Sequence, residues 1–330
     1  MALKLNYRPA MKSGLIGLFV LAMWGSNAAA TAGVVQEGRQ GRPTFRASTD
    51  LVTVAATVRT RRGRPVVNLK PSDFQLLDSG KPRIITDFKS EPAPVSVALL
   101  VDFSGSMEVG ERRGAARDAA AHVVNFLKPD IDQAGLYVFD QKLHEVQAIA
   151  PAPGGVLAQI ESMARPFGAT SLFDAIAETG RVLAGTGGQR RAVIALTDGA
   201  DNASRLTASE VSGIASSIDV PVYIVVIVSP LDRDGKTTID DPRLMDAALE
   251  GPLADLARWT GGQIFVGAGP SQSLDAARQI VSELRQHYLI AFEPDGRPGW
   301  HPIELRTRDE DHVVRARSGY IVQDGRRQGL

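Results

Sequence analysis

Three oxygen-bearing side chains stand at every second position between residues 102 and 106. Asp102, Ser104 and Ser106 come directly after the continuous apolar run Val95–Val101. In an extended segment, side chains two residues apart point to the same side, so these three can converge on one point. One carboxylate and two hydroxyls are hard oxygen donors, which suit Mg²⁺, Mn²⁺ or Ca²⁺ better than zinc. The pattern therefore predicts part of a divalent-cation site.

Two further stretches offer the same chemistry. Asp198 follows the apolar run Val193–Leu196, and Thr170 lies in the stretch Gly168–Ser171 before a helical pattern. Ligand sites in doubly wound sheets lie at the carboxyl ends of strands where the strand order reverses. Asp102 and Asp198 both follow such strands. A plainer interpretation stays open, in which the hydroxyl side chains cap helices and Asp198 forms a turn.

The three stretches together resemble the von Willebrand factor A (VWA) domain. The resemblance rests on Asp-x-Ser-x-Ser at 102–106, a Gly-x-Thr loop before Leu172–Ile176, and Thr-Asp-Gly at 197–199, and it covers about residues 95–284. It implies a complete metal-ion-dependent adhesion site, whose five positions correspond to Asp102, Ser104, Ser106, Thr170 and Asp198. The expected ion is Mg²⁺, with Mn²⁺ or Ca²⁺ as alternatives. The resemblance also implies an open coordination position that an Asp or Glu of a partner protein fills.

Alternating strand and helix patterns between residues 92 and 286 must position these loops. Continuous apolar strands separated by amphipathic helices, the last at Leu274–Arg285, are typical of a parallel sheet covered on both faces. The short connection Asp140–Lys142 leaves room only for a hairpin, so Leu143–Ile149 is expected to be an antiparallel edge strand. The expected fold is α/β, with a doubly wound, mostly parallel six-stranded sheet.

At both ends of the chain, apolar and polar residues alternate with a period of two, which indicates strands and not helices. Residues 48–91 and 287–323 contain short alternating strands separated by turns, and neither segment is long enough to bury a core alone. We therefore expect the two segments to pair into one smaller β-sandwich, with the α/β unit of residues 92–286 inserted between them. Two independent β modules are the alternative. Residues 324–330 are expected to form a tail.

The first 32 residues have the pattern of a secretory signal peptide. Three basic residues precede the apolar run Leu15–Trp24, and small residues follow, so cleavage after Ala30 or Ala32 fits. Residues 33–47 are polar and are expected to be a linker. We predict an exported protein, periplasmic or secreted, with no transmembrane span after processing. Short segments such as Ser72–Phe74 and Arg317–Tyr320 also resemble exported bacterial VWA-related proteins.

Composition excludes several classes of site and partner. The chain has 37 basic and 37 acidic residues, which argues against a nucleic-acid partner, and it has no cysteine, which excludes disulfides and thiolate chemistry. The stretch Leu231–Thr237 lacks the glycine and helix of a phosphate-binding loop, so we interpret it as a surface excursion. The five histidines are scattered and none lies in the three loops.

These observations predict a non-enzymatic, exported, metal-dependent protein-binding module. A cation held by the five residues accepts an acidic side chain from a partner protein. The alternatives are a scaffold subunit of an envelope enzyme complex, or a structural envelope protein in which the metal only stiffens the loops.

Overall fold

The structure, a computed structural model, describes residues 51–151, 154–162, 168–188, 190–217, 219–229 and 250–322. The expected signal peptide, linker and tail, and the stretch Leu231–Thr237, lie outside the described residues. No helix within the described ranges is long and apolar enough to span a membrane.

A six-stranded sheet forms the centre of the α/β unit within the described residues. Its strand order is β10-β9-β8-β5-β6-β7, and β7 runs antiparallel to β6 whereas the other pairs are parallel. The hairpin at Asp140–Lys142 places β7 at the edge, so the predicted α/β class and the mostly parallel six-stranded sheet are confirmed. The strands are β5 (Ser96–Asp102), β6 (Gln133–Phe139), β7 (Leu143–Pro151), β8 (Arg191–Thr197), β9 (Val222–Ile227) and β10 (Ile264–Gly267).

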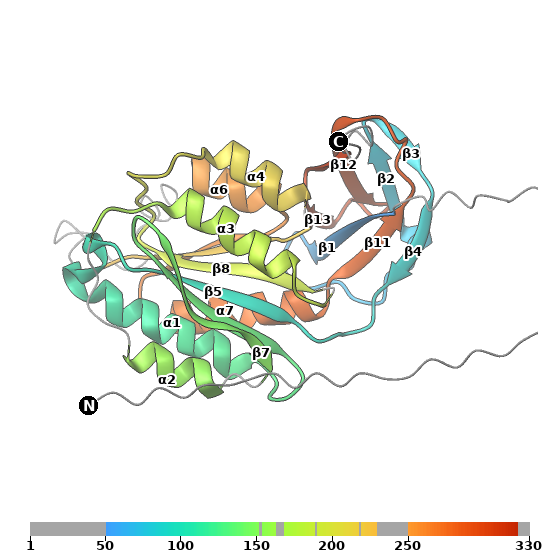
Figure 1. Cartoon of the computed structure of the whole chain (residues 1–330). Coiled ribbons are helices and arrows are strands. Elements are labelled where there is room, and N and C mark those ends of the chain that lie inside the picture. Colours follow the sequence, from blue (N-terminus) through green and yellow to red (C-terminus); the bar gives the residue numbers. More distant parts are fainter. Residues whose placement is uncertain are drawn as a thin grey trace, which may run out of the picture. The chain divides into compact units, whose positions relative to one another are not determined.

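Helices cover both faces of this sheet (Figure 1). In β5, Val97 and Leu99 belong to the apolar layer that contains side chains of α1, α2 and α7, whereas Ala98 and Leu100 belong to the opposite layer, which contains side chains of α3, α4 and α6. Because alternate side chains of one strand enter two apolar layers, the strand is apolar throughout. The helices are α1 (Arg112–Phe126), α2 (Gly154–Ser162), α3 (Leu172–Ala184), α4 (Ala208–Ser217), α6 (Pro252–Trp259) and α7 (Pro270–Arg285), and the short 3₁₀ segment η2 (Gly105–Glu111) precedes α1.

Strands from both ends of the described chain alternate in two further sheets, with the orders β13-β1-β11-β4 and β14-β12-β2-β3. β1 pairs with β11 and β13, and β12 pairs with β2 and β14. One apolar cluster contains side chains of both sheets, among them Val54, Leu76, Ile290 and Leu305. The elements are β1 (Val52–Thr60), η1 (Pro71–Asp73), β2 (Phe74–Asp78), β3 (Lys81–Arg83), β4 (Ile85–Lys89), β11 (Tyr288–Phe292), β12 (Gly299–Thr307), β13 (His312–Ala316) and β14 (Gly319–Val322).

A buried carboxylate joins helix α7 to the two four-stranded sheets, which we call the outer sheets. The Glu283 side chain is 3% exposed and forms ion pairs with Arg59 of β1 and Arg315 of β13. Burial of a carboxylate costs free energy unless a positive charge compensates it. The two arginines supply that charge where α7 meets the sheet β13-β1-β11-β4.

Candidate metal centre

The strand order reverses at β5, and this brings two of the predicted ligands together. From β5 the chain continues to β6 and β7 on one side, whereas β8, β9 and β10 lie on the other. Asp102 is the last residue of β5, and Asp198 follows the last residue of β8. Since β5 and β8 are parallel neighbours, both carboxylates lie at the same end of the sheet, at its topological switch point.

Asp102 is almost fully buried, at 1% exposure. Its Oδ1 accepts the Ser104 backbone N–H at 2.8 Å, and its Oδ2 accepts the Thr197 hydroxyl at 2.6 Å. Burial raises the pKa of Asp102, the hydrogen bonds from Ser104 and Thr197 lower it in part, and the negative charge of Asp198 raises it further. The carboxylate is thus held rigidly where a nearby positive charge would stabilise its ionised form.

The serines of the first loop face each other. The hydroxyl oxygens of Ser104 and Ser106 are 3.0 Å apart, and Ser104 is buried at 1% exposure. Ser104 is the N-cap residue of η2, yet its side chain makes no capping hydrogen bond, and the same holds for Ser171 at the N-terminus of α3. Helix capping therefore does not account for these hydroxyls.

Thr170 is joined to the site through its own loop. The Gly168 carbonyl accepts the Gly105 N–H at 2.9 Å, which ties this loop to the first one. The Thr170 N–H donates to the Asn202 side chain at 2.9 Å, which ties it to the loop after β8. Thr170 itself is 1% exposed. All five predicted residues therefore lie on three loops that contact one another.

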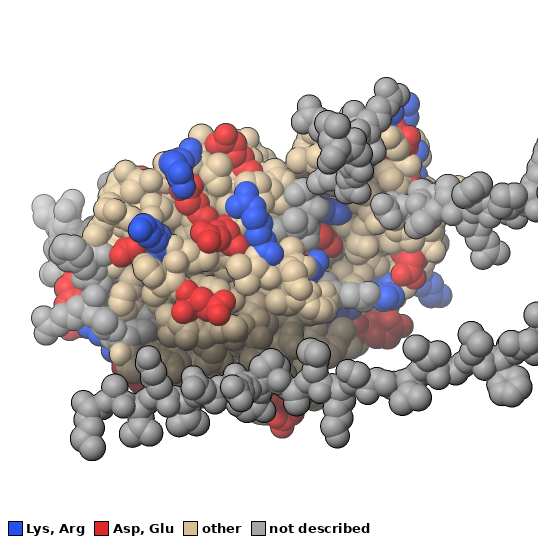
Figure 2. All heavy atoms as spheres, in the orientation of Figure 1, with Lys and Arg blue, Asp and Glu red and all other residues tan. Residues whose placement is uncertain are grey.

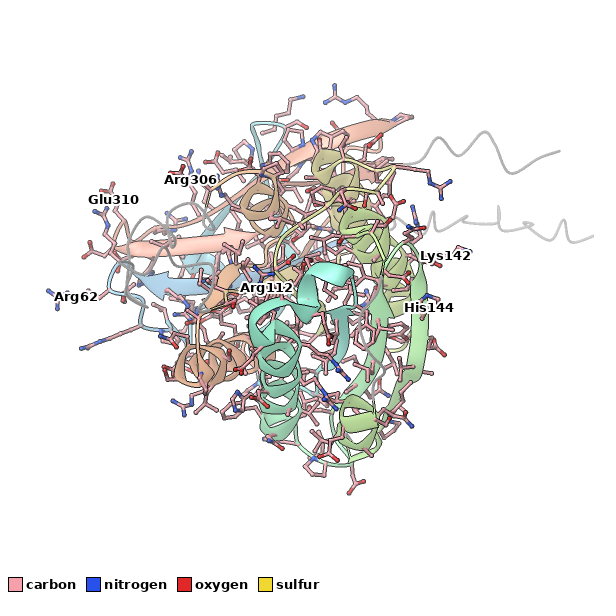
Figure 3. The ribbon with its side chains drawn as sticks, turned by 90° about the vertical axis from the view of Figure 1, so that its left-hand side faces the viewer. Arg62, Arg112, Lys142, His144, Arg306 and Glu310 are labelled. Carbon is pink, nitrogen blue, oxygen red and sulfur yellow. The ribbon has the colours of Figure 1, made fainter. Side chains whose placement is uncertain are left out.

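Arg112 is a residue of this site that the sequence did not predict. Its Nη1 donates to the Ser106 carbonyl at 2.8 Å and lies 3.5 Å from Asp198 Oδ2. Asp198 Oδ1 accepts the Ala200 N–H at 3.1 Å, so part of the predicted turn is also present. Figure 3 looks onto this end of the sheet and shows Arg112 near its middle, with Lys142 and His144 to one side.

The donor set fits a hard divalent cation. The carboxylates of Asp102 and Asp198 and the hydroxyls of Ser104 and Ser106 come together at this end of the sheet. Within the described residues, the groups that act on the Asp102 carboxylate are the Thr197 hydroxyl, Ser104 and the negative charge of Asp198. A buried carboxylate next to a second one is unfavourable without a compensating charge. Asp102, Ser104, Ser106, Thr170 and Asp198 would hold the ion, which would supply a positive charge able to attract an anionic ligand.

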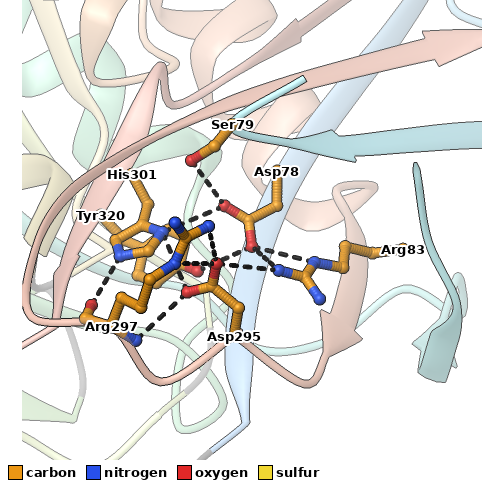
Figure 4. A network of polar contacts seen from close by, with 7 residues as sticks. All are labelled: Asp78, Ser79, Arg83, Asp295, Arg297, His301 and Tyr320. Carbon is orange, nitrogen blue, oxygen red and sulfur yellow. Dashed lines mark hydrogen bonds and ion pairs between the residues drawn. The ribbon is translucent and has the colours of Figure 1, made fainter. Parts of the chain in front are cut away.

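A second cluster of possible metal ligands contains Asp78 of β2, His301 of β12 and Asp295 of the connection between β11 and β12 (Figure 4). Arg83 contacts Asp78 Oδ2 at 2.8 Å, and Arg297 binds Asp295 at 2.8 Å. These guanidinium groups offset the negative charge of the two carboxylates, so the three residues form part of an ion network that needs no metal for its charge balance. Sequence reasoning missed it because Asp78 and Asp295 look like ordinary turn residues, and the folded chain alone joins them to His301.

A model of the von Willebrand factor type A domain family matches residues 97–200. This segment is VWA-like. It contains all three loops of the site, including Asp102, Thr170 and Asp198. No curated protein sequence matches the chain.

Solved structures with a similar arrangement include three bacterial proteins. An aerotolerance-related membrane protein from Bacteroides fragilis is 18% identical, with a TM-score of 0.45, and the match covers 58% of this chain and 98% of that one. BatB from Bacteroides thetaiotaomicron is 19% identical, with the same TM-score and the same coverage. A von Willebrand factor type A protein from Catenulispora acidiphila is 12% identical over 84% of this chain and 74% of that one, with a TM-score of 0.44.

Proposed function

We propose that this protein is a metal-dependent protein-binding module. A divalent cation, Mg²⁺ or alternatively Mn²⁺ or Ca²⁺, is held by Asp102, Ser104, Ser106, Thr170 and Asp198, and it accepts an Asp or Glu side chain of a partner protein. The observation that carries the proposal is the buried Asp102, which lies beside Asp198 and two facing hydroxyls at the switch point of a VWA-like sheet.

A binding role fits the chemistry of the groups that meet at the site better than catalysis does. The proposal assigns both carboxylates, Asp102 and Asp198, to the cation, and the remaining charged group, the Arg112 guanidinium, does not act as a base. We therefore propose that the protein is not an enzyme. Figure 2 shows acidic and basic side chains interspersed on one face, a surface that does not favour nucleic acid as the partner.

Export and domain insertion complete the proposal. Residues 1–32 act as a signal peptide, which places the mature protein in the periplasm or outside the cell. The α/β unit is inserted into a β-sandwich formed by the two ends of the chain. Support for the insertion comes from β1, which pairs with β11 and β13 although the whole α/β unit of residues 92–286 separates β1 from these two strands in the sequence.

Metal titration of an Asp102→Ala variant tests the proposal. We expect the wild-type protein to bind Mn²⁺ or Mg²⁺, as measured by calorimetry, and the variant to lose this binding. Asp275→Ala is the matched control, because it removes the same charge from a side chain that is 72% exposed on α7. Equal metal affinity in the wild-type protein and Asp102→Ala would refute the site.

Partner capture from an envelope extract separates adhesion from the alternatives. The proposal expects proteins that the wild type retains in Mg²⁺ and releases in EDTA, and that Asp102→Ala does not retain. Capture that is equal in Mg²⁺ and EDTA would favour a scaffold or a structural role in which the metal only stiffens the loops.

A further inference from the structure

Arg112 changes the charge of the proposed metal site. With both carboxylates ionised, Asp102 and Asp198 together carry two negative charges, which a divalent cation would neutralise completely. Arg112 adds one positive charge, since its Nη1 lies 3.5 Å from Asp198 Oδ2. The metal-loaded site with Arg112 therefore carries a net charge of about plus one, because a guanidinium stays protonated in proteins.

The backbone before α1 directs this side chain toward the site. Gly110 and Glu111 both have left-handed conformations, with φ of 60° and 65°, and Glu111 is the N-cap residue of α1. Two successive left-handed residues turn the chain sharply, and the non-glycine Glu111 adopts this conformation at some cost. The turn makes Arg112 the first helical residue, from which its guanidinium reaches back to the Ser106 carbonyl at 2.8 Å.

The Arg112 side chain is largely buried between two loops of the site. It is 13% exposed, and it bridges the first loop, through Ser106, and the third loop, through Asp198. A charge held at this depth is screened by solvent less than an exposed one, so it acts on groups bound at the same carboxylates.

We infer that Arg112 sets the balance between metal and partner at this site: it weakens binding of the cation and strengthens binding of the carboxylate that follows. The inference rests on the proposed function and adds a specificity-determining residue to it. Because like charges repel, Arg112 weakens binding of the cation. Once the cation is bound, Arg112 leaves the site with a net positive charge, and this charge attracts an anionic ligand. An uncharged ligand of the same shape gains nothing from this charge.

The signature of this role is a pair of opposite effects in Arg112→Gln. We expect the variant to bind Mn²⁺ about threefold to tenfold more tightly, and its Mn²⁺-loaded form to bind acetate more weakly by a similar factor. A role in loop structure alone would weaken both affinities. Arg112→Lys keeps the charge, so both of its affinities should stay close to those of the wild type.

The experiment uses Mn²⁺ and acetate as probes. Mn²⁺ binding is followed by the electron paramagnetic resonance signal of the free ion. Acetate binding is followed by the relaxation of its methyl protons near bound Mn²⁺, with acetamide as the uncharged comparison. Arg205→Gln is the matched control, since it removes the same charge from a side chain that is 94% exposed, and it should leave both affinities unchanged.

The outcomes separate this inference from the proposed function. Opposite changes in Arg112→Gln, confined to acetate and absent with acetamide, support the inference. Parallel losses, or no change, in a protein whose Mn²⁺ binding depends on Asp102 overturn the role of Arg112 alone. If Arg112→Gln does not fold, losses of both affinities in a folded Arg112→Lys overturn the inference as well. Absence of Mn²⁺ binding to the wild-type protein overturns both proposals.

Discussion

Thr197 links the two carboxylate-bearing loops of the proposed metal centre, and replacing it with valine tests how that link supports the site. Its hydroxyl donates to Asp102 Oδ2 at 2.6 Å and accepts the Gly199 N–H at 3.0 Å. Valine has nearly the same shape and fills the same fully buried position, but it can do neither. The substitution Thr197→Val therefore removes two hydrogen bonds without opening a cavity.

The two contacts set the expected size of the effect. A hydrogen bond to a charged acceptor contributes about 1.5–3 kcal/mol, and an unpaired buried N–H costs about 1–3 kcal/mol. Water can reach the half-buried Gly199, so we expect a total loss near the lower end, about 2–3 kcal/mol of unfolding free energy. Loss of a group that orients a metal ligand also lowers metal affinity by about 10- to 100-fold.

Urea unfolding without metal and Mn²⁺ titration of the folded protein measure these two effects. The matched control is Thr179→Val on α3. Thr179 is also fully buried, and its hydroxyl has no hydrogen-bond partner within the described part of the chain. Replacing this unpaired buried hydroxyl with a methyl group should leave stability unchanged or raise it by about 1 kcal/mol, and it should leave Mn²⁺ affinity unaltered.

Two results would refute this reasoning. Equal losses of stability in both valine variants would mean that the effect comes from the threonine-to-valine exchange and not from the contacts of Thr197. A less stable Thr197→Val that binds Mn²⁺ as tightly as the wild type would mean that Asp102 does not need this hydrogen bond to act as a ligand.

Two further predictions concern the junction between α7 and the outer strands. Burial, with nearby arginine charges, lowers the pKa of His287 to about 3, so the unfolded chain takes up the proton first and the fold loses stability as pH falls below 6.5. Between pH 8 and pH 5, urea unfolding should show His287→Gln losing about 2 kcal/mol less than the wild type, and parallel losses would contradict this assignment. Glu283→Gln leaves Arg59 and Arg315 without their shared carboxylate, and we expect it to lower the unfolding free energy by about 3 kcal/mol. Asp275→Asn is the control, because the Asp275 side chain is exposed. If both variants lowered the unfolding free energy by the same small amount, the ion pairs of Glu283 would contribute little to stability.

The parallel sheet and its edge strand were predictable because their signals are local. A continuous apolar run such as Val193–Leu196 indicates a strand buried on both faces wherever it occurs. The three-residue connection Asp140–Lys142 is too short for a crossover, so the antiparallel edge follows from length alone. Helix α7 begins at Pro270, four residues before the predicted start at Leu274, because proline is well suited to the first turn of a helix.

Arg112 and the acidic network were not predictable, since both depend on residues distant in the sequence. Nothing near Arg112 indicates that its guanidinium meets Asp198, which lies on a loop after another strand. The same is true of Asp78 and His301, whose nitrogen and oxygen atoms lie 3.3 Å apart although 223 residues separate them.

The sequence by itself determined the kinds of element and the donor types of the candidate site, because strand and helix periods and the spacing of Asp102, Ser104 and Ser106 are properties of short segments. It also contains Gly262, which looks like an ordinary turn residue. Only the tertiary structure shows that no larger residue fits at this position, since a Cβ atom would lie 1.9 Å from the Val222 carbonyl oxygen. It likewise decided which charge meets Asp198. Electrostatic and steric contacts depend on distance in space, and only the packed chain sets those distances.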